Sequence, residues 1–359
     1  MDHAASARWE ALQNFDRKVL PSLDGIRGFA VLLVLFYHNI SVHIPGPMGV
    51  EIFFVLSGFL ITRLLLVERD KAGTISIRSF YWRRAVRIFP VFYLYMIAVA
   101  AVDHVSPGYY WSGMTYTLNY YVALHGNQGN TMYHLWSLAV EEQFYLLWPF
   151  TFFLFRNRLD VLKWCTAILI ALSQIYKLLI MHHVSSDHMY RSFDTRGPEI
   201  LTGCLLALVL HHSREVPQWL LSRAVLFVGL LELCVSASFA DATSVAYFHL
   251  VDAVVIAIIM MQAIHYAPKS LNRGPLKFVG LISYSLYVYH PIMSLAANSL
   301  HLRWSVSVLL SMSMAIAAAA LSRYTFEAWF LKLKSLVRPA APRSNALSPA
   351  TASASRIDG

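Results

Sequence analysis

The sequence predicts an all-α fold, a polytopic membrane bundle of about ten transmembrane helices. The first observation is composition: 57% of the 359 residues are hydrophobic and only 14% are charged, with a mean hydropathy of +0.51. A soluble domain carries about 25% charged residues. The second observation is that apolar segments of roughly 18 to 22 residues, long enough to cross a hydrocarbon core, recur from Leu23 almost to the end of the chain.

These apolar segments predict the membrane helices one by one. The first follows a polar stretch without an apolar signal-peptide region, so we expect it to remain in the protein as an anchor. The ten predicted spans lie at about 23–42, 48–67, 86–103, 137–155, 161–181, 197–212, 217–238, 246–266, 277–298 and 304–325.

The distribution of basic residues predicts the orientation. The loops and tails on one side hold 25 of the 29 Lys and Arg residues, and the loops on the other side hold only Arg191, Arg196 and Arg303. Cytoplasmic loops are enriched in Lys and Arg, so we expect both termini in the cytoplasm of a bacterial inner membrane. The formal charge of +9 then needs no nucleic-acid partner.

The same analysis divides the chain into three parts. We expect a cytoplasmic N-terminal tail at 1–22 and a transmembrane domain at 23–326. A cytoplasmic, mostly disordered tail is expected at 327–359, whose final part is rich in Pro, Ala and Ser. No set of His, Cys and Asp residues has the spacing of metal ligands, so we expect no metal and no permanently bound cofactor.

Ionisable side chains in the first two predicted helices are candidates for catalysis, because burying them in a membrane is costly. Arg27 and His38 are eleven residues apart, close to three helical turns, so they share one face at a separation of roughly 16 Å. Glu51, early in the next helix, could orient the imidazole of His38 as a hydroxyl-activating base requires. The structural alternatives are a satisfied core histidine and a glutamate that stabilises a helix N-terminus.

Paired arginines at the start of the third predicted helix suggest a phosphate site. Arg84 and Arg87 are spaced i, i+3 and therefore share a face, which Arg83 does not. Guanidinium groups bind phosphates in a fixed, forked geometry. The alternative is an ordinary basic flank that contacts anionic lipid.

The fourth predicted helix opens with polar and aromatic side chains on the outer side. We expect Trp136, Glu141, Glu142 and Tyr145 to contact an acceptor substrate there, with the two glutamates pointing about 100° apart. The alternative is that the glutamates lie at the water interface, where they cost little. Two further polar features stay open: a cluster of Asp194, Arg196 and Glu199, and the segment 283–291, whose tyrosines either line a cavity or pack.

Five motifs in this order resemble the acyltransferase 3 family of bacterial membrane enzymes, over about residues 20 to 326. They are LDGIRGFA at 23–30 followed by His38, VEIFFVLSGFLI at 50–61, RRAVRIFP at 83–90, WSLAVEEQFY at 136–145 and SYSLYVYHP at 283–291. The resemblance implies that His38 is the essential catalytic residue. It also implies that Arg84 and Arg87, together with Arg27, serve an acyl-CoA co-substrate.

The resemblance further implies O-acylation of a glycan. We expect transfer of an acyl group, acetyl above all, from cytosolic acyl-CoA to a hydroxyl of a glycan such as a surface polysaccharide or a lipo-oligosaccharide. Family members often carry a fused extracellular domain, so a separate extracytoplasmic partner protein is an expectation here. The alternatives are acylation of a macrolide or another small secreted glycoside and, in a different class, glycan transport with buried His and Glu residues as a proton relay.

Overall fold

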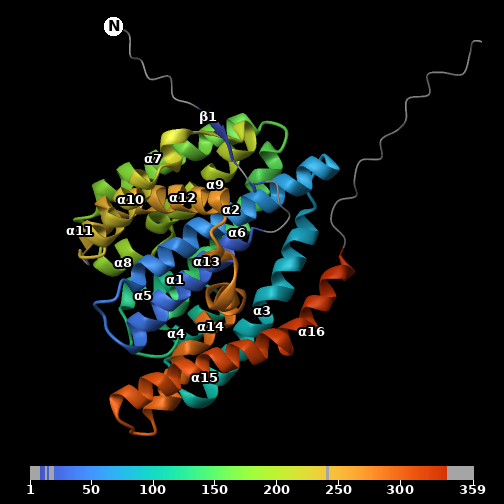
Figure 1. Cartoon of the computed structure of the whole chain (residues 1–359). Helices are drawn as coiled ribbons and strands as arrows, with labels where there is room; N and C mark the ends of the chain where they lie inside the picture. Colours follow the sequence, from blue (N-terminus) through green and yellow to red (C-terminus); the bar gives the residue numbers. More distant parts are fainter. Residues whose placement is uncertain (1–8, 13, 16–19, 240–241, 338–359) are drawn as a thin grey trace, which may run out of the picture.

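The computed structural model describes residues 9–12, 14–15, 20–239 and 242–337, and these are almost entirely helical (Figure 1). The longer helices are α1 Pro21–Asn39, α2 Gly46–Ala72, α3 Ile77–Val102, α6 Trp136–Phe155, α7 Leu159–Ile180, α9 Phe193–Ser213, α10 Arg223–Ser236, α12 His249–Tyr266, α14 Gly274–Asn298 and α15 Trp304–Tyr324. The shorter elements are β1 Trp9–Ala11, α4 Pro107–Met114, α5 Leu118–His125, η1 Tyr133–Leu135, α8 Ser186–Arg191, β2 Glu215–Pro217, η2 Gln218–Leu221, α11 Ala242–Tyr247, α13 Lys269–Asn272, α16 Phe326–Lys332 and η3 Leu333–Leu336.

Each predicted span coincides with one of these longer helices. Six stretches of the described chain are long and apolar enough to cross a membrane: α2, α3, α7, α12, α14 and the run from Trp304 to Leu336. Helices α1 and α6 carry ionisable side chains in their apolar runs, and α10, at 14 residues, is only about 21 Å long. The all-α membrane class is confirmed, whereas the number ten and the orientation of the termini stay predictions.

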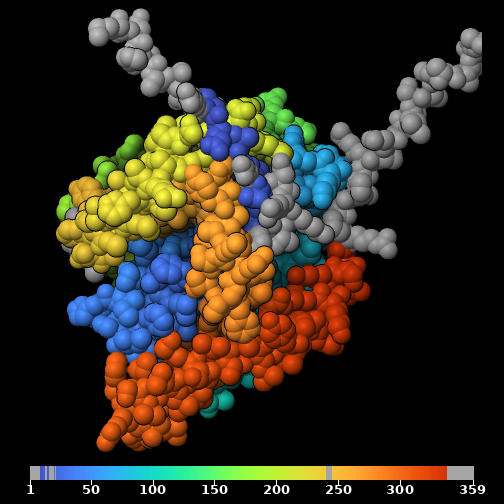
Figure 2. All heavy atoms as spheres, viewed as in Figure 1, coloured from blue at the N-terminus to red at the C-terminus, as the bar shows by residue number. Residues whose placement is uncertain are grey.

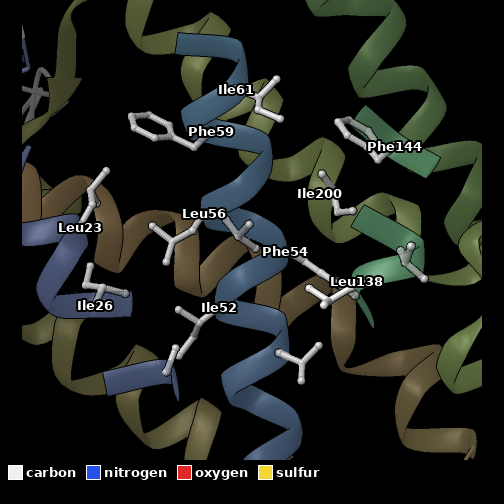
Figure 3. Close-up of a cluster of buried hydrophobic side chains, with 14 of the residues drawn as sticks. Leu23, Ile26, Ile52, Phe54, Leu56, Phe59, Ile61, Leu138, Phe144 and Ile200 are labelled. Carbon is white, nitrogen blue, oxygen red and sulfur yellow. The ribbon is translucent and has the colours of Figure 1, made fainter. Parts of the chain in front are cut away.

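Helix α2 forms the centre of the bundle. Its buried side chains Ile52 and Phe54 belong to a cluster that includes Leu23 of α1 and Leu138 of α6 (Figure 3). By contrast, only 17% of the apolar 18-residue stretch of α7 is buried within the protein. The exposed apolar side chains of an outer helix suit contact with lipid tails, because a bilayer removes the penalty that water would impose.

Glycines set the close crossing of α1 and α14. A Cβ on Gly28 of α1 would collide with the backbone carbonyl of Leu276 in α14, and one on Gly280 would collide with the carbonyl of Asp24. Membrane helices approach closely where small residues leave their backbones uncovered. The first motif of the sequence therefore fixes how α1 crosses α14, and α1 in turn carries Arg27 and His38.

Parts of both predicted tails take part in the fold. Within the predicted N-terminal tail, β1 pairs antiparallel with β2. Within the predicted C-terminal tail, α16 and η3 lie along α3, where the indole Nε1 of Trp82 donates to the carbonyl oxygen of Leu333 at 2.8 Å. The Pro-, Ala- and Ser-rich segment from 339 onward lies outside the described residues. In the space-filling view, α15 and α16 (red) run along one edge, beside the orange segment that precedes them (Figure 2).

Candidate functional site

The structure brings six of the predicted site residues, Tyr145 among them, into one cavity of about 140 Å³, which we call the charged cavity. Its ionisable lining residues are Arg27, Arg84, Arg87, Glu141 and Glu142, and they come from α1, α3 and α6. Side chains of α2 and α14 complete the wall. Three guanidinium groups thus meet two carboxyl groups inside the helix bundle.

The arginines are arranged as the i, i+3 spacing predicted. Arg84 and Arg87 both line the charged cavity. Arg83 instead pairs with Glu68 at 2.9 Å, outside it. Arg84 binds Glu142 at 3.2 Å and its guanidinium lies on the face of the Tyr145 ring. The Nε of Arg84 is buried and has no hydrogen-bond partner among the described residues, so it is a donor that a ligand in the cavity could use.

We expected the two glutamates of α6 to contact an acceptor on the outer side, apart from the arginines, and that side stays a prediction. Both line the same cavity as the arginines. Glu141 accepts a hydrogen bond from the hydroxyl of Ser57 on α2 at 2.6 Å, whereas Glu142 faces Arg84 on α3. The two carboxyl groups thus have partners on different helices, and both helices contribute residues to the lining of the cavity.

Trp136 does not line the charged cavity. Its ring packs edge-on against Phe54, with centroids 6.1 Å apart, and lies 5.2 Å from the ring of Tyr190. Only 4% of the residue is exposed. Among the described contacts Trp136 therefore has the surroundings of a core residue, while Tyr145 is the aromatic side chain of this motif that reaches a cavity.

His38 lies at a second, open cavity, a groove of about 810 Å³ formed by the ends of α1 and α14 and the start of α15. We call it the polar groove; residues that characterise it are His38, Asn39, Asn298, His301, Trp304 and Ser311. None of the described residues that line it is Asp, Glu, Lys or Arg. His38 is exposed there, so its ring is accessible to a ligand in the groove.

The backbone of α1 fixes the tautomer of His38. Its Nδ1 lies 2.9 Å from the carbonyl oxygen of Val34, one turn earlier in the same helix. A carbonyl oxygen only accepts, so in the neutral ring Nδ1 carries the proton and Nε2 carries the free lone pair. A histidine held in this way is prepared to take a proton at Nε2.

Glu51 does not orient His38 among the described contacts. Its carboxylate lies 3.1 Å from Nε2 of His249 on α12 and 3.8 Å from Arg196 on α9. The residue is 2% exposed. Position 51 faces α9 and α12 rather than the end of α1, so the pairing expected from the sequence is replaced by an ion-pair network elsewhere.

That network confirms part of the predicted outer cluster. Glu199 on α9 binds Lys177 on α7 at 2.9 Å, and both side chains are fully buried. Arg196 lies 4.0 Å from Glu199, which links this pair to Glu51. Asp194, which the sequence grouped with them, points elsewhere and lies 2.9 Å from His188.

The segment 283–291 contributes to the site. The sequence left open whether its tyrosines line a cavity or pack against other residues. Ser283, Tyr284 and Tyr287 line the charged cavity. His290, one turn after Tyr287, lies against His38 with ring centroids 5.0 Å apart. In the sequence, only the position of His290 in an apolar segment, within the motif at 283–291, pointed to it as a functional residue. Its contact with His38 depends on how α1 crosses α14.

Comparisons with known proteins give a matching family model and several relatives. A family model described as an acyltransferase domain matches residues 20–324. The peptidoglycan O-acetyltransferase OatA of Listeria monocytogenes is 30% identical over 324 residues, which cover 80% of this chain and 51% of that protein. The O-acetyltransferase OatA of Staphylococcus aureus is 29% identical over 338 residues, covering 82% of this chain and 54% of its own length. The chain therefore spans about half the length of these curated relatives. No solved structure gives a significant match.

Proposed function

The chain belongs to the acyltransferase 3 family, whose domain model covers residues 20–324, and from this premise we propose that it is a membrane O-acyltransferase acting on a glycan. The observation that carries the proposal is the position of His38. His38 is exposed at the polar groove, and its Nε2 is free because Nδ1 is bonded to the backbone. Arg27, on the same helix, lines the charged cavity. One helix thus joins a site for an anion to a site for a neutral hydroxyl compound.

We propose acyl-CoA, with acetyl as the acyl group, as the donor at the charged cavity. Its phosphates carry the negative charge that Arg27, Arg84 and Arg87 complement. A cavity of about 140 Å³ is smaller than a whole coenzyme A molecule. Only one end of the donor is therefore enclosed, and the rest extends beyond the cavity.

The acceptor in this proposal is a glycan hydroxyl that enters the polar groove. Asn, Ser and His side chains both donate and accept hydrogen bonds, as sugar hydroxyls do. The exposed Trp304 provides an apolar face for a sugar ring. Two relatives are named O-acetyltransferases, one of them for peptidoglycan, which supports a cell-wall or surface glycan as the acceptor class.

The reaction follows from these positions. Nε2 of His38 takes the proton of the acceptor hydroxyl as the oxygen attacks the thioester carbonyl carbon. The carbon–oxygen bond forms, the carbon–sulfur bond breaks, and the thiolate of coenzyme A leaves. The proton then passes from His38 to the thiolate, so that an ester and free coenzyme A result.

The proposed setting is the bacterial inner membrane, with both termini in the cytoplasm. The support is the uneven distribution of Lys and Arg and the six apolar stretches that can cross a membrane. The donor would then approach from the cytosol and the acceptor from the outer side. We also propose that an extracytoplasmic protein assists with the acceptor.

The test is acetyl transfer by the purified full chain in lipid vesicles, with radiolabelled acetyl-CoA and a soluble peptidoglycan fragment. We expect labelled ester from the wild type and a loss of about 10³-fold or more in His38→Ala, because a positioned base contributes about 10² to 10⁴-fold. His182→Ala, at an exposed histidine after α7, should keep the wild-type rate. A well-folded His38→Ala protein with full activity would overturn the proposal, and glycan transport without ester formation would favour a transporter.

A further inference from the structure

The last described elements, α16 and η3, lie against the part of α3 that carries the paired arginines (Figure 1). The indole Nε1 of Trp82 donates to the carbonyl oxygen of Leu333 at 2.8 Å. The hydroxyl of Ser79 donates to the carbonyl oxygen of Val337 at 3.3 Å. Both donors lie within one helical turn before Arg84 on α3, so η3 is fixed beside the donor site of the proposed function.

The junction of α15 and α16 is anchored to α14. The carboxylate of Glu327, which is 6% exposed, accepts a hydrogen bond from the hydroxyl of Ser285. The hydroxyls of Tyr289 and Ser322 form a second hydrogen bond at 3.1 Å. Arg323 lies in the chain between these two anchors. It is therefore held beside α14, a helix that also lines the charged cavity.

Three basic residues from different elements gather at this place. Arg87 of α3, Arg323 of α15 and Lys334 of η3 lie near enough to one another for their charges to repel, and we call them the basic cluster. Among the described residues none of the three forms an ion pair. Arg87 is exposed and the other two are half-buried, so a ligand can reach all three.

The arginines next to the basic cluster are neutralised within the protein, whereas the cluster is not. Arg84 binds Glu142 at 3.2 Å, and Arg83 binds Glu68 at 2.9 Å. Like charges that lie together repel, and an anion between them turns the repulsion into attraction. Guanidinium and ammonium groups are the usual partners of phosphate in proteins. The basic cluster therefore has the composition of a phosphate site.

We propose that the basic cluster binds the 3′-phosphate of the coenzyme A donor, outside the charged cavity. This inference rests on the proposed function, in which a cavity of about 140 Å³ encloses only one end of acyl-CoA. The 3′-phosphate is a monoester at the other end of the donor and carries about 1.5 to 2 negative charges at neutral pH. Arg87 belongs to both the cavity and the cluster, so one donor can contact both. The cluster would then select coenzyme A over donors without this phosphate.

The test compares acetyl-CoA with 3′-dephospho-acetyl-CoA as donors for the full chain in phosphatidylcholine vesicles. In the wild type, we expect loss of the 3′-phosphate to raise donor KM about 10- to 10²-fold, because hydrogen bonds between charged groups are strong. The double variant Arg323→Ala with Lys334→Ala should raise KM for acetyl-CoA by a similar factor. Its KM for the dephospho donor should stay within about threefold of the wild type.

Two further variants separate phosphate binding from a structural role. Arg323→Lys keeps the charge and should retain most of the preference for acetyl-CoA. Lys332→Ala removes an exposed lysine of α16 and should leave the preference unchanged. A loss of affinity for both donors by the same factor in the double variant would mean that these residues support the fold, and would overturn the proposal.

The remaining outcomes keep this inference apart from the proposed function. Equal use of both donors by the wild type would overturn the role of the basic cluster and leave the acetyl-CoA donor standing. A wild type that transfers acetyl from neither donor would overturn the proposed donor itself. A donor KM that responds to added phosphatidylglycerol but not to the 3′-phosphate would assign the cluster to lipid headgroups instead.

Discussion

The charged cavity and the polar groove share α1 and α14 but differ in the chemistry of their walls. The cavity gathers three arginines and two glutamates inside the bundle, whereas none of the described residues lining the groove is Asp, Glu, Lys or Arg. Charged side chains among membrane helices are retained where they bind or react, because their burial is costly. The difference supports our proposal of two ligands, an anionic donor at the cavity and a neutral acceptor at the groove.

Apart from the loss of His38 itself, the largest effect should follow from removing charge from the cavity. Arg84→Ala combined with Arg87→Ala should raise KM for acetyl-CoA by about 10²-fold, because each charged contact contributes about 1.5–3 kcal/mol. KM for the acceptor should stay the same. Initial rates over a range of donor concentrations measure this.

Two single variants control that experiment. Arg83→Ala removes a neighbouring arginine that pairs with Glu68 outside the cavity and should leave donor KM within about twofold. Arg87→Ala alone leaves the Arg84–Glu142 pair intact, so an effect there cannot come from an unpaired glutamate. A double variant with normal donor KM would mean that these arginines anchor the helix at the membrane surface.

The contrast between the regions also shows what the sequence could predict. Helical period alone places Arg84 and Arg87 together and Arg83 apart, and it places Arg27 and His38 on one face of α1. These relations lie within single helices, where the spacing of residues fixes direction. The structure agrees with the placement of the three arginines of α3, whereas Arg27 and His38 line different cavities.

Relations between helices could not be read in this way. The partner of Glu51 is His249, which comes from α12 almost two hundred residues later. His290 reaches His38 only because Gly28 and Gly280 let α1 and α14 cross closely. The periodicity of one helix does not show which other helix packs against it. The sequence therefore predicts Glu51 as the partner of His38, whereas in the structure His38 contacts a backbone carbonyl and a second histidine.

A smaller effect is expected in the polar groove. Trp304→Ala removes an aromatic side chain that is 65% exposed. It should raise KM for the glycan acceptor several-fold, since an aromatic contact contributes about 0.5–1.5 kcal/mol, and leave donor KM unchanged. Trp219→Ala, at a tryptophan 59% exposed in η2 and away from the groove, is the matched control. A change in donor KM instead would contradict the division of labour between the two regions.

The smallest effect on transfer is expected at Glu51, whose network belongs to neither region. Glu51→Gln keeps the shape of the side chain but removes its charge, leaving Arg196 and His249 without this carboxylate. Breaking a buried ion pair costs about 3–5 kcal/mol of stability. The loss in Glu51→Gln should be smaller, because the pair of Lys177 and Glu199 stays intact. We therefore expect a lower unfolding temperature and a lower yield, with a turnover number per folded molecule close to that of the wild type. Active-site titration with a slowly released donor analogue would count the folded molecules.

A turnover number reduced about 10²-fold at an unchanged unfolding temperature would instead show that Glu51 acts on His38 in the working enzyme. The ion-pair network of Glu51 would then have to rearrange when substrate binds.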